Sequence, residues 1–223
     1  MRNFDWQQYI ANYPELNHFT ESMAIKHFKR YGQFQQKTDQ KDLTLCKITV
    51  ITPCSRPENL LKIKESLNFE HIVEWIIVYD NIICTTQFEN EKISEYCHKS
   101  EGKYGFPQRN YGLSVVKNEK SYIHFLDDDN IVHPDLYNLS LLPNKIYTFD
   151  QENKDGSLRL TGNHIRVAKI DTAMFLVWFP MVKGIQFITD KYDSDGYYIT
   201  TCYSNNKGSL IYVPKVLCWY NKI

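Results

Sequence analysis

The sequence predicts an α/β domain built on a mostly parallel β-sheet, and three observations support this fold class. Strand-like and helix-like segments alternate from Lys47 onward, which is typical of parallel strands joined by crossover helices. Polar residues directly follow the predicted strands, at the end where ligands gather in open sheets of this kind. Hydrophobic residues make up 43% of the 223 residues and are spread along the chain, which is enough for one substantial core.

The first half of this domain alternates regularly. It contains predicted strands at 48–51, at 75–79 and just before Asp127, and predicted helices at 58–67, around 88–97 and at 108–117. After Pro143 the alternation weakens. Three segments there, 145–150, 158–168 and 173–179, each have the composition of a strand, and 153–156 resembles a hairpin turn.

Residues 1–44 are predicted to form a separate helical module that ends in a polar linker, so that the main domain spans 45–223. Asp5 and Gln8 form a capping-box pattern, and a second helix from Thr20 to Tyr31 would end at Gly32. The module has too many aromatic residues to bury alone. We therefore expect it to pack on the main domain or on a partner, and self-association through these helices is one hypothesis.

The composition excludes several classes of function. Lysine plus arginine and aspartate plus glutamate both total 26, so no basic excess points to a nucleic-acid partner. No apolar run is long enough to span a bilayer, and the N-terminus lacks a signal-peptide core. The expectation is a cytoplasmic protein, which for a viral protein would mean the host cytoplasm.

The most informative feature is the apolar run 122–126, which ends in three adjacent acids, Asp127, Asp128 and Asp129. Three ionised carboxylates at the end of a buried strand repel one another and need a counter-charge. Hard oxygen ligands suit Mn²⁺ or Mg²⁺, which bridge to substrate phosphates. A divalent ion bound with a diphosphate is the leading interpretation, and an acidic turn followed by a helix cap at His133 is the alternative.

Four segments in order, 51–57, 78–80, 108–110 and 125–130, resemble the motifs of the glycosyltransferase A (GT-A) fold of nucleotide-sugar-dependent enzymes. The likeness covers roughly residues 45 to 200 and is strongest to the family 2-like or glucuronyltransferase-like type. It implies a Rossmann-like central sheet flanked by helices. It also implies a UDP-sugar donor and a glycan or glycoprotein acceptor.

The resemblance assigns roles to residues at the strand ends. Nucleotide-sugar binding falls to Thr52, Pro53, Arg56, Asp80, Arg109, Asp127 and Asp128, and metal binding falls to Asp129. A carboxylate such as Asp80 suits the uracil imide N–H, and Arg109 would face phosphate oxygens from a helix start. For Thr52, Arg56, Asp80 and Arg109 the alternatives are ordinary strand-end, loop, turn and salt-bridge roles.

Related enzymes often add a late histidine to the metal site, but the last histidine here is His164. Substrate and water would then complete the coordination shell of Mn²⁺ or Mg²⁺, or the ion would be held weakly. The second half of the domain, after Pro143, should shape the acceptor side of the site. The segment 171–175 resembles the strand that frames the acceptor pocket in related enzymes. Trp178 and Phe179 there are candidates for stacking on a sugar, with core packing as the alternative.

The catalytic base of an inverting transferase should come from the segment 190–197. Asp195 resembles the family's base most closely because it precedes a predicted helix start, and Asp193 is the second candidate. The resemblance thus predicts a metal-dependent, inverting glycosyltransferase. The rivals are a nucleotidyltransferase, which no glycine-rich phosphate loop supports, and a non-catalytic nucleotide- or sugar-binding module.

Overall fold

The structure is a computed structural model, and it describes residues 4–11, 13, 16–32, 46–80, 88–99 and 103–223. Contacts divide the chain into two units, Met1–Leu45 and Cys46–Ile223. Within the described residues, no helix combines the length and the apolar composition needed to cross a membrane.

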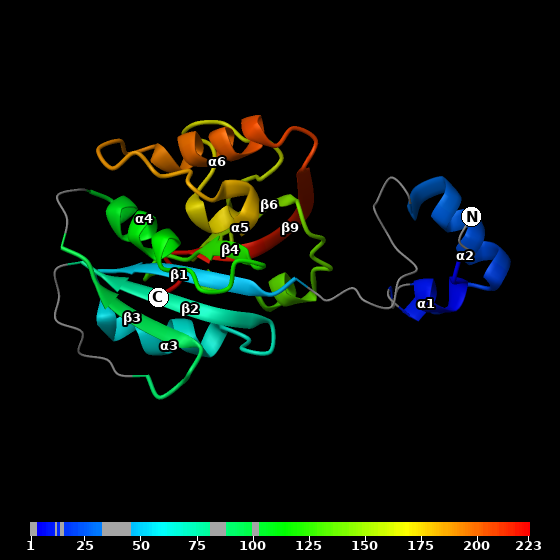
Figure 1. The fold of residues 1–223 in the computed structure, drawn as a ribbon, viewed down its shortest axis with the longest axis horizontal. Coiled ribbons are helices and arrows are strands. Elements are labelled where there is room, and N and C mark those ends of the chain that lie inside the picture. Colours follow the sequence, from blue (N-terminus) through cyan, green and yellow to red (C-terminus); the bar gives the residue numbers. More distant parts are fainter. Residues whose placement is uncertain (1–3, 12, 14–15, 33–45, 81–87, 100–102) are drawn as a thin grey trace. The chain divides into compact units, whose positions relative to one another are not determined.

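The larger unit is a mixed α/β structure with one curled sheet (Figure 1). Its strands are β1 (Ile48–Cys54), β2 (Ile72–Tyr79), β3 (Ile93–Cys97), β4 (Tyr122–Phe125), β5 (Ile131–Val132), β6 (Ile146–Asn153), β7 (Leu158–Leu160), β8 (Phe175–Trp178) and β9 (Leu210–Tyr220). Its helices are α3 (Leu60–Ser66), α4 (Phe106–Ser114), α5 (Phe179–Val182) and α6 (Ser194–Asn205), with short 3₁₀ turns η3 (Pro57–Asn59), η4 (Pro134–Asn138) and η5 (Thr172–Met174).

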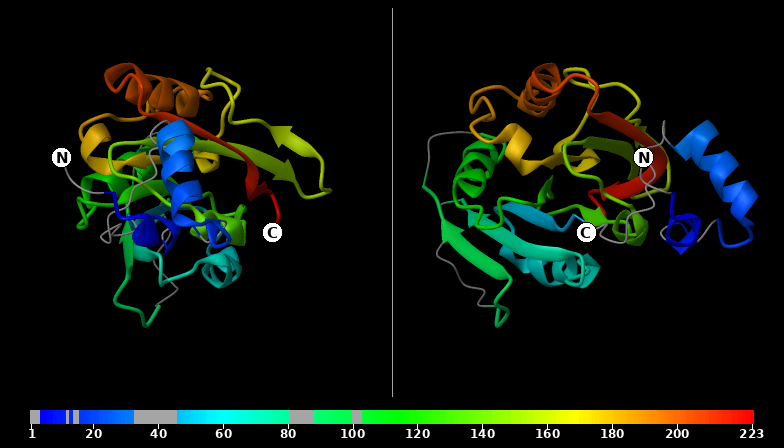
Figure 2. Two further views of the ribbon diagram at one scale, coloured as in Figure 1. Left: turned by 90° about the vertical axis from the view of Figure 1, so that its right-hand side faces the viewer. Right: turned by 45° about the vertical axis from the view of Figure 1, so that its right-hand side comes forward.

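The strand order is β3-β2-β1-β4-β8-β6-β9-β5, with β7 paired to β6. The strands β2, β1 and β4 are mutually parallel, as the alternation predicts, and β3, which was not predicted as a strand, adds to β2 in parallel. Strand β8 runs antiparallel to β4 and joins this half to β6, which pairs in parallel with β9. The β6–β7 hairpin projects beyond the rest of the sheet (Figure 2). The predicted turn at 153–156 is confirmed, because the Gly156 N–H donates to the Asn153 carbonyl (3.0 Å) and the two strands pair.

The two faces of the sheet bury separate cores. Every residue of β1 is buried, and its successive side chains point to opposite faces. Val50 packs in the core beneath α3, whereas Ile51 packs in the core beneath α4 and α6. Figure 1 shows α3 on one side of the sheet and α4, α5 and α6 on the other. Because β1, β2, β3 and β4 pair in parallel, their carboxyl ends lie at the same edge of the sheet.

The helix predicted around 88–97 is wrong, because Ile93–Cys97 is strand β3. Strand β2 is almost wholly buried, so the backbone groups along its outer edge need partners. Pairing with β3 supplies them, and the Tyr79 hydroxyl also donates to Glu95 Oε1 (2.7 Å). Two further differences concern the second half: β7 covers only the start of the segment 158–168, and the long strand β9 was not predicted.

The smaller unit contains α1 (Trp6–Ala11) and α2 (Glu21–His27), which continues as a π-helical turn, η2 (Phe28–Gly32). The Gln8 N–H donates to Asp5 Oδ1 (3.0 Å), as the capping-box pattern predicts. Two of its aromatics, Tyr9 and Tyr13, are buried, whereas Tyr31 is 45% exposed, so the packing of this module on another surface stays a prediction. Tyr9 is fully buried among the other aromatics, and its hydroxyl lies 2.9 Å from His27 Nδ1.

Helix α4 lies close to β1, and Gly112 makes this approach possible. A Cβ at Gly112 would lie 2.5 Å from Cγ2 of the buried Ile51. We therefore expect Gly112→Ala to lower the free energy of unfolding by about 1–3 kcal/mol through overpacking. The exposed Ser114→Ala on the same helix is the control and should change stability by less than about 0.5 kcal/mol. Thermal unfolding of both variants measures this, and equal stability would contradict the close packing of α4.

Candidate functional site

The carboxyl ends of β1, β2 and β4 meet at one edge of the sheet and form a hollow of about 300 Å³, here called the strand-end hollow. Its lining combines residues from all three strand ends with the start of α4 and the end of β9. They are Pro53, Cys54, Ser55, Arg56, Asp80, Tyr104, Gly105, Gln108, Arg109, Asp127, Asp128, Asp129 and Tyr220. All the residues predicted for the nucleotide and the metal are here except Thr52.

Asp128 is the most enclosed of the three acids. Its Oδ2 accepts the backbone N–H groups of Ser55 (2.6 Å) and Arg56 (2.7 Å) and the Ser55 hydroxyl (3.0 Å). Its Oδ1 accepts two bonds from the Arg56 guanidinium, from Nε (2.9 Å) and Nη2 (2.5 Å). Asn59 Nδ2 donates to the Asp128 carbonyl (2.8 Å). Asp128 therefore fastens the loop after β1 to the acidic segment after β4.

Asp129 shares the Arg56 guanidinium, with Arg56 Nη2 2.7 Å from Asp129 Oδ2. The Asp129 side chain is 18% exposed and that of Arg56 is 46% exposed, so this ion pair lies at the surface of the hollow. Partial burial raises the pKa of Asp129, and the nearby guanidinium opposes that rise. Arg56 is therefore an in-chain counter-charge for two of the three acids.

Arg109 neutralises Asp127 from the other side. Its side chain is only 3% exposed, Nη2 forms an ion pair with Asp127 Oδ1, and Nη1 donates to the Tyr104 carbonyl (2.7 Å). Burial raises the pKa of Asp127, while Arg109 acts in the opposite direction. Arg109 forms a buried ion pair rather than the surface salt bridge that was its alternative, and these two guanidinium nitrogens already have partners in the chain. Its role toward phosphate oxygens stays a prediction.

Asp80 and Thr52 have different surroundings. Asp80 Oδ1 accepts a hydrogen bond from Gln108 Nε2 (3.0 Å), which also lies 3.4 Å from the His98 carbonyl. Thr52 is fully buried, and its hydroxyl accepts the indole N–H of Trp75 (2.9 Å). The structure thus places Asp80 on the wall of the hollow, and it places Thr52 in the core.

An adjoining hollow of about 300 Å³ lies beside the first and shares Tyr104, Arg109, Asp127 and Tyr220 with it. The rest of its lining comes from the start of α4, from β7, from the segment before β8 and from the segment that leads into α6: Phe106, Arg159, Leu160, Ala168, Ile170, Asp171, Thr172, Tyr192, Asp193 and Asp195. Both predicted base candidates line this adjoining hollow. The residues that the two hollows share form a common wall between the acids of β4 and those of α6.

Asp195 lies in the first turn of α6, and its Oδ1 accepts the Gly196 N–H (2.7 Å). Burial raises the pKa of Asp195 to about 7, and the charges of Asp171 and Asp127 add to the rise. The Gly196 hydrogen bond and the Arg109 charge oppose it. A carboxylate with such a pKa can accept a proton near neutral pH, which is the property that a general base requires.

Several lining residues were not predicted individually: Tyr104, Gln108, Arg159 and Tyr220. Tyr220 ends strand β9, whose position depends on long-range pairing that no local motif reveals. Tyr104 and Gln108 flank the recognised Arg109, so the turn before α4 was the available signal. Trp178 and Phe179, the alternative stacking residues, are buried in the two cores, which agrees with core packing.

The donor set can be tested against a divalent ion. The described part of the chain holds no group of three or more histidine, cysteine, aspartate or glutamate side chains arranged to bind a metal. Asp127 pairs with a buried arginine and Asp128 with an arginine and backbone groups, whereas the partner of Asp129 is only the half-exposed Arg56, so Asp129 is the acid best able to bind an ion. One carboxylate fits Mn²⁺ or Mg²⁺ when the ion arrives with substrate phosphates and water, because these ions are commonly held in that way. The residues fit an ion shared with a ligand and do not form an all-protein cage.

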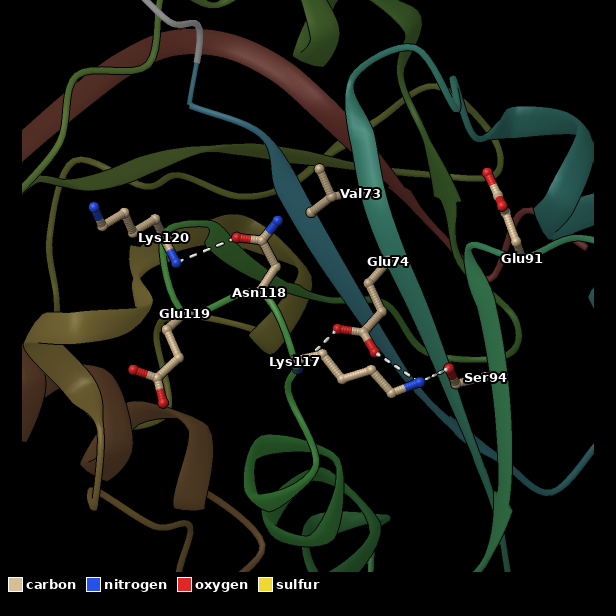
Figure 3. A pocket seen from close by; sticks show the side chains of 8 residues that line it. All are labelled: Val73, Glu74, Glu91, Ser94, Lys117, Asn118, Glu119 and Lys120. Carbon is tan, nitrogen blue, oxygen red and sulfur yellow. Dashed lines mark hydrogen bonds and ion pairs between the residues drawn. The ribbon is translucent and has the colours of Figure 1, made fainter.

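A larger hollow, of about 440 Å³, lies at the opposite edge of the sheet, where the parallel strands begin. Figure 3 shows the Lys117 side chain reaching across it toward Glu74 and Ser94. The Lys117 backbone N–H donates to the buried Glu74 Oε2 (3.1 Å). These contacts hold a buried carboxylate in place, and this edge lacks the strand-end acids and the adjoining acidic hollow.

Comparison with known proteins gives a fold assignment. No protein-family model matches the sequence, and no curated protein is significantly similar to it. Among solved structures, residues 1–349 of S. aureus TarS match with a TM-score of 0.59 at 13% identity, over 78% of this chain and 60% of that one. A second solved structure also matches, and both are GT-A proteins.

That structure is glucosyl-3-phosphoglycerate synthase from Mycobacterium tuberculosis, in complex with Mn²⁺, UDP and phosphoglyceric acid. It matches with a TM-score of 0.50 at 11% identity, over 78% of this chain and 70% of that one. The chain has the GT-A fold. A 2-C-methyl-D-erythritol 4-phosphate cytidylyltransferase from Francisella tularensis also matches, with a TM-score of 0.45 at 13% identity, over 79% of this chain and 93% of that one. Because the chain spans only 60% of the TarS fragment, its activity is inferred from its own site.

The buried Arg109–Asp127 pair should be essential to the stability of this GT-A site. We expect Arg109→Met to cost about 1–3 kcal/mol at pH 8, because the partly buried carboxylate of Asp127 is left without its partner. The loss should shrink toward pH 5: without Arg109 the pKa of Asp127 rises further, so protonation relieves the buried charge at low pH.

Urea unfolding at both pH values measures the effect. Adding Asp127→Asn to Arg109→Met should restore most of the stability. Lys183→Met, which breaks the exposed ion pair with Glu119, is the matched control and should cost less than about 1 kcal/mol. A pH-independent loss in Arg109→Met would contradict the role of charge neutralisation.

Proposed function

We propose that this protein is a metal-dependent, inverting glycosyltransferase that moves a sugar from a UDP-sugar to a hydroxyl group of a glycan or glycoprotein. The observation that carries the proposal is the pair of hollows with a common wall. One hollow contains the three-acid segment at the strand ends, and the other contains Asp195, whose pKa lies near 7. A transferase needs such an arrangement, with donor and base on opposite sides of the reacting carbon.

The donor would lie in the strand-end hollow. Asp80 would accept the uracil imide N–H, with Gln108 fixing its orientation through the 3.0 Å hydrogen bond. Asp129 would hold Mn²⁺ or Mg²⁺, and that ion would stabilise negative charge on the departing UDP. Arg56, which is partly exposed and already bound to Asp129, is the cation best placed to contact the phosphates. The synthase that shares this fold was solved with Mn²⁺ and UDP, which supports the same choice of ligand here.

The acceptor would lie in the adjoining hollow. Asp195 would take the proton of the acceptor hydroxyl while its oxygen attacks the anomeric carbon from the face opposite UDP. Its raised pKa suits this step, because the carboxylate is basic enough to bind the proton and is still ionised in part at neutral pH. Asp193 lines the same hollow and remains the second candidate.

The donor site can be tested by calorimetric titration of UDP with and without Mn²⁺. We expect Mn²⁺ to strengthen binding at least about tenfold, since the ion would be held by both the Asp129 carboxylate and the ligand. Asp129→Ala should abolish this gain. Asp155→Ala is the matched control, because Asp155 lies in the exposed β6–β7 turn and should leave binding unchanged. Absence of UDP binding under both conditions would overturn the proposal.

The base can be tested by its pH dependence, using UDP-sugars and simple glycosides screened for UDP release. Below pH 7 Asp195 is protonated and cannot accept the hydroxyl proton, so kcat/KM should rise with pH through about 7. Asp195→Asn should lower turnover by at least about a hundredfold while UDP binding persists. Asp193→Asn is the matched comparison and should retain turnover.

A rate that is flat above pH 5 would point to an acid with an ordinary pKa and would remove Asp195 from the role. Release of pyrophosphate from a nucleoside triphosphate would instead favour a nucleotidyltransferase. Binding of UDP without turnover of any tested donor would favour a non-catalytic module.

A further inference from the structure

The charge of the adjoining hollow constrains the acceptor. Its lining contains four carboxylates and two guanidinium groups. Arg109 is paired with Asp127, and Arg159 Nη1 lies 3.1 Å from Asp171 Oδ2. Within the described part of the chain, no cation forms an ion pair with Asp193 or Asp195. Both guanidinium groups are thus neutralised by the protein, and the hollow keeps an excess of negative charge.

The interior partners of Arg159 reinforce this conclusion. Besides Asp171, it donates to Gln151 Oε1, and its guanidinium lies 3.7 Å from the centre of the Tyr220 ring. Gln151 Nε2 donates in turn to Asp171 Oδ1 (3.3 Å). An incoming anion would have to break this network to reach the Arg159 charge. The cation therefore orders the wall of the hollow and is poorly available to a substrate.

Two tyrosines in the lining are exposed. The rings of Tyr104 and Tyr192 meet edge to face, with centroids 5.1 Å apart, and their residues are 52% and 75% exposed. Tyr104 has a φ of 63°, a left-handed conformation that is unfavourable for a bulky residue. The next residue, Gly105, also has a positive φ, and this turn brings the Tyr104 carbonyl to Arg109. The strained turn thereby holds one aromatic ring at the junction of the two hollows.

Aromatic rings beside carboxylates suit one class of ligand. The C–H face of a sugar ring packs on an aromatic ring, and carboxylates accept hydrogen bonds from sugar hydroxyls. A phosphate or carboxylate on the ligand would instead meet uncompensated negative charge. Building on the proposed function, we propose that the acceptor is an uncharged sugar packed against the Tyr104–Tyr192 pair, and that the hollow discriminates against anionic acceptors.

Ligand-observed NMR on UDP-saturated protein tests this proposal. The probes are methyl glycosides of glucose, galactose, mannose and N-acetylglucosamine, each compared with glucose 6-phosphate and glucuronic acid. We expect at least one neutral glycoside to bind, and the anionic sugars to bind at least about tenfold more weakly at low salt. Raising the ionic strength should narrow that difference, as should Asp193→Asn.

The aromatic contact has a matched pair of variants. Tyr192→Ala should weaken binding of the neutral glycoside about fivefold. Tyr197→Ala, which removes another exposed tyrosine nearby that does not line the hollow, should leave it unchanged. Both side chains are exposed, so neither substitution should unfold the protein.

Anionic sugars that bind as tightly as neutral ones would overturn the inference, and so would equal effects of the two tyrosine variants. UDP binding measured on the same samples separates this failure from failure of the proposed function. If UDP binds and no neutral glycoside does, only the inference about the acceptor is lost. If UDP does not bind, the proposed donor site is wrong.

Discussion

The site depends on the neutralisation of three adjacent carboxylates by two arginines that come from different parts of the chain. Asp127, Asp128 and Asp129 end a buried strand, where repulsion between unpaired charges would be large. Arg56, in the loop after β1, and Arg109, in the first turn of α4, supply the compensation. These ion pairs join the ends of β1 and β4 to the start of α4, so the hollow and its charge pattern form together.

The same charges determine the chemistry of the adjoining hollow. Asp195 lies close enough to Asp171 and Asp127 for their charges to raise its pKa further, while Arg109 limits that rise. Burial is the largest cause, but the final value depends on how completely the acidic segment is neutralised. A change in the Arg109–Asp127 pair should therefore affect both the stability of the strand-end hollow and the basicity of a group in the other hollow. The common wall couples the two electrostatically.

The sequence was sufficient for the strands β1, β2 and β4 and for most of the strand-end hollow. There, apolar strands run directly into polar residues, and parallel pairing brings those ends together. Prediction from the sequence failed where long-range contacts determine the structure. Ile93–Cys97 is a strand because β2 needs an edge partner, and Tyr220 reaches the site through β9, which has no motif. Thr52 illustrates the remaining limit, because the Trp75 indole N–H that donates to its hydroxyl belongs to a different strand. No local pattern distinguishes a strand-end hydroxyl in a site from one in a core.

The three acids also differ in how easily each can change partners. Asp127 faces a deeply buried guanidinium, and loss of that pair would leave a charge of either sign without compensation. Asp128 would keep two backbone N–H groups and the Ser55 hydroxyl without Arg56, so it has no need of another cation. Asp129 depends on Arg56, whose side chain is nearly half exposed and can be rehydrated at low cost. In the proposed function, a cation that enters with a diphosphate would therefore take over Asp129 alone, while the other two acids would maintain the framework.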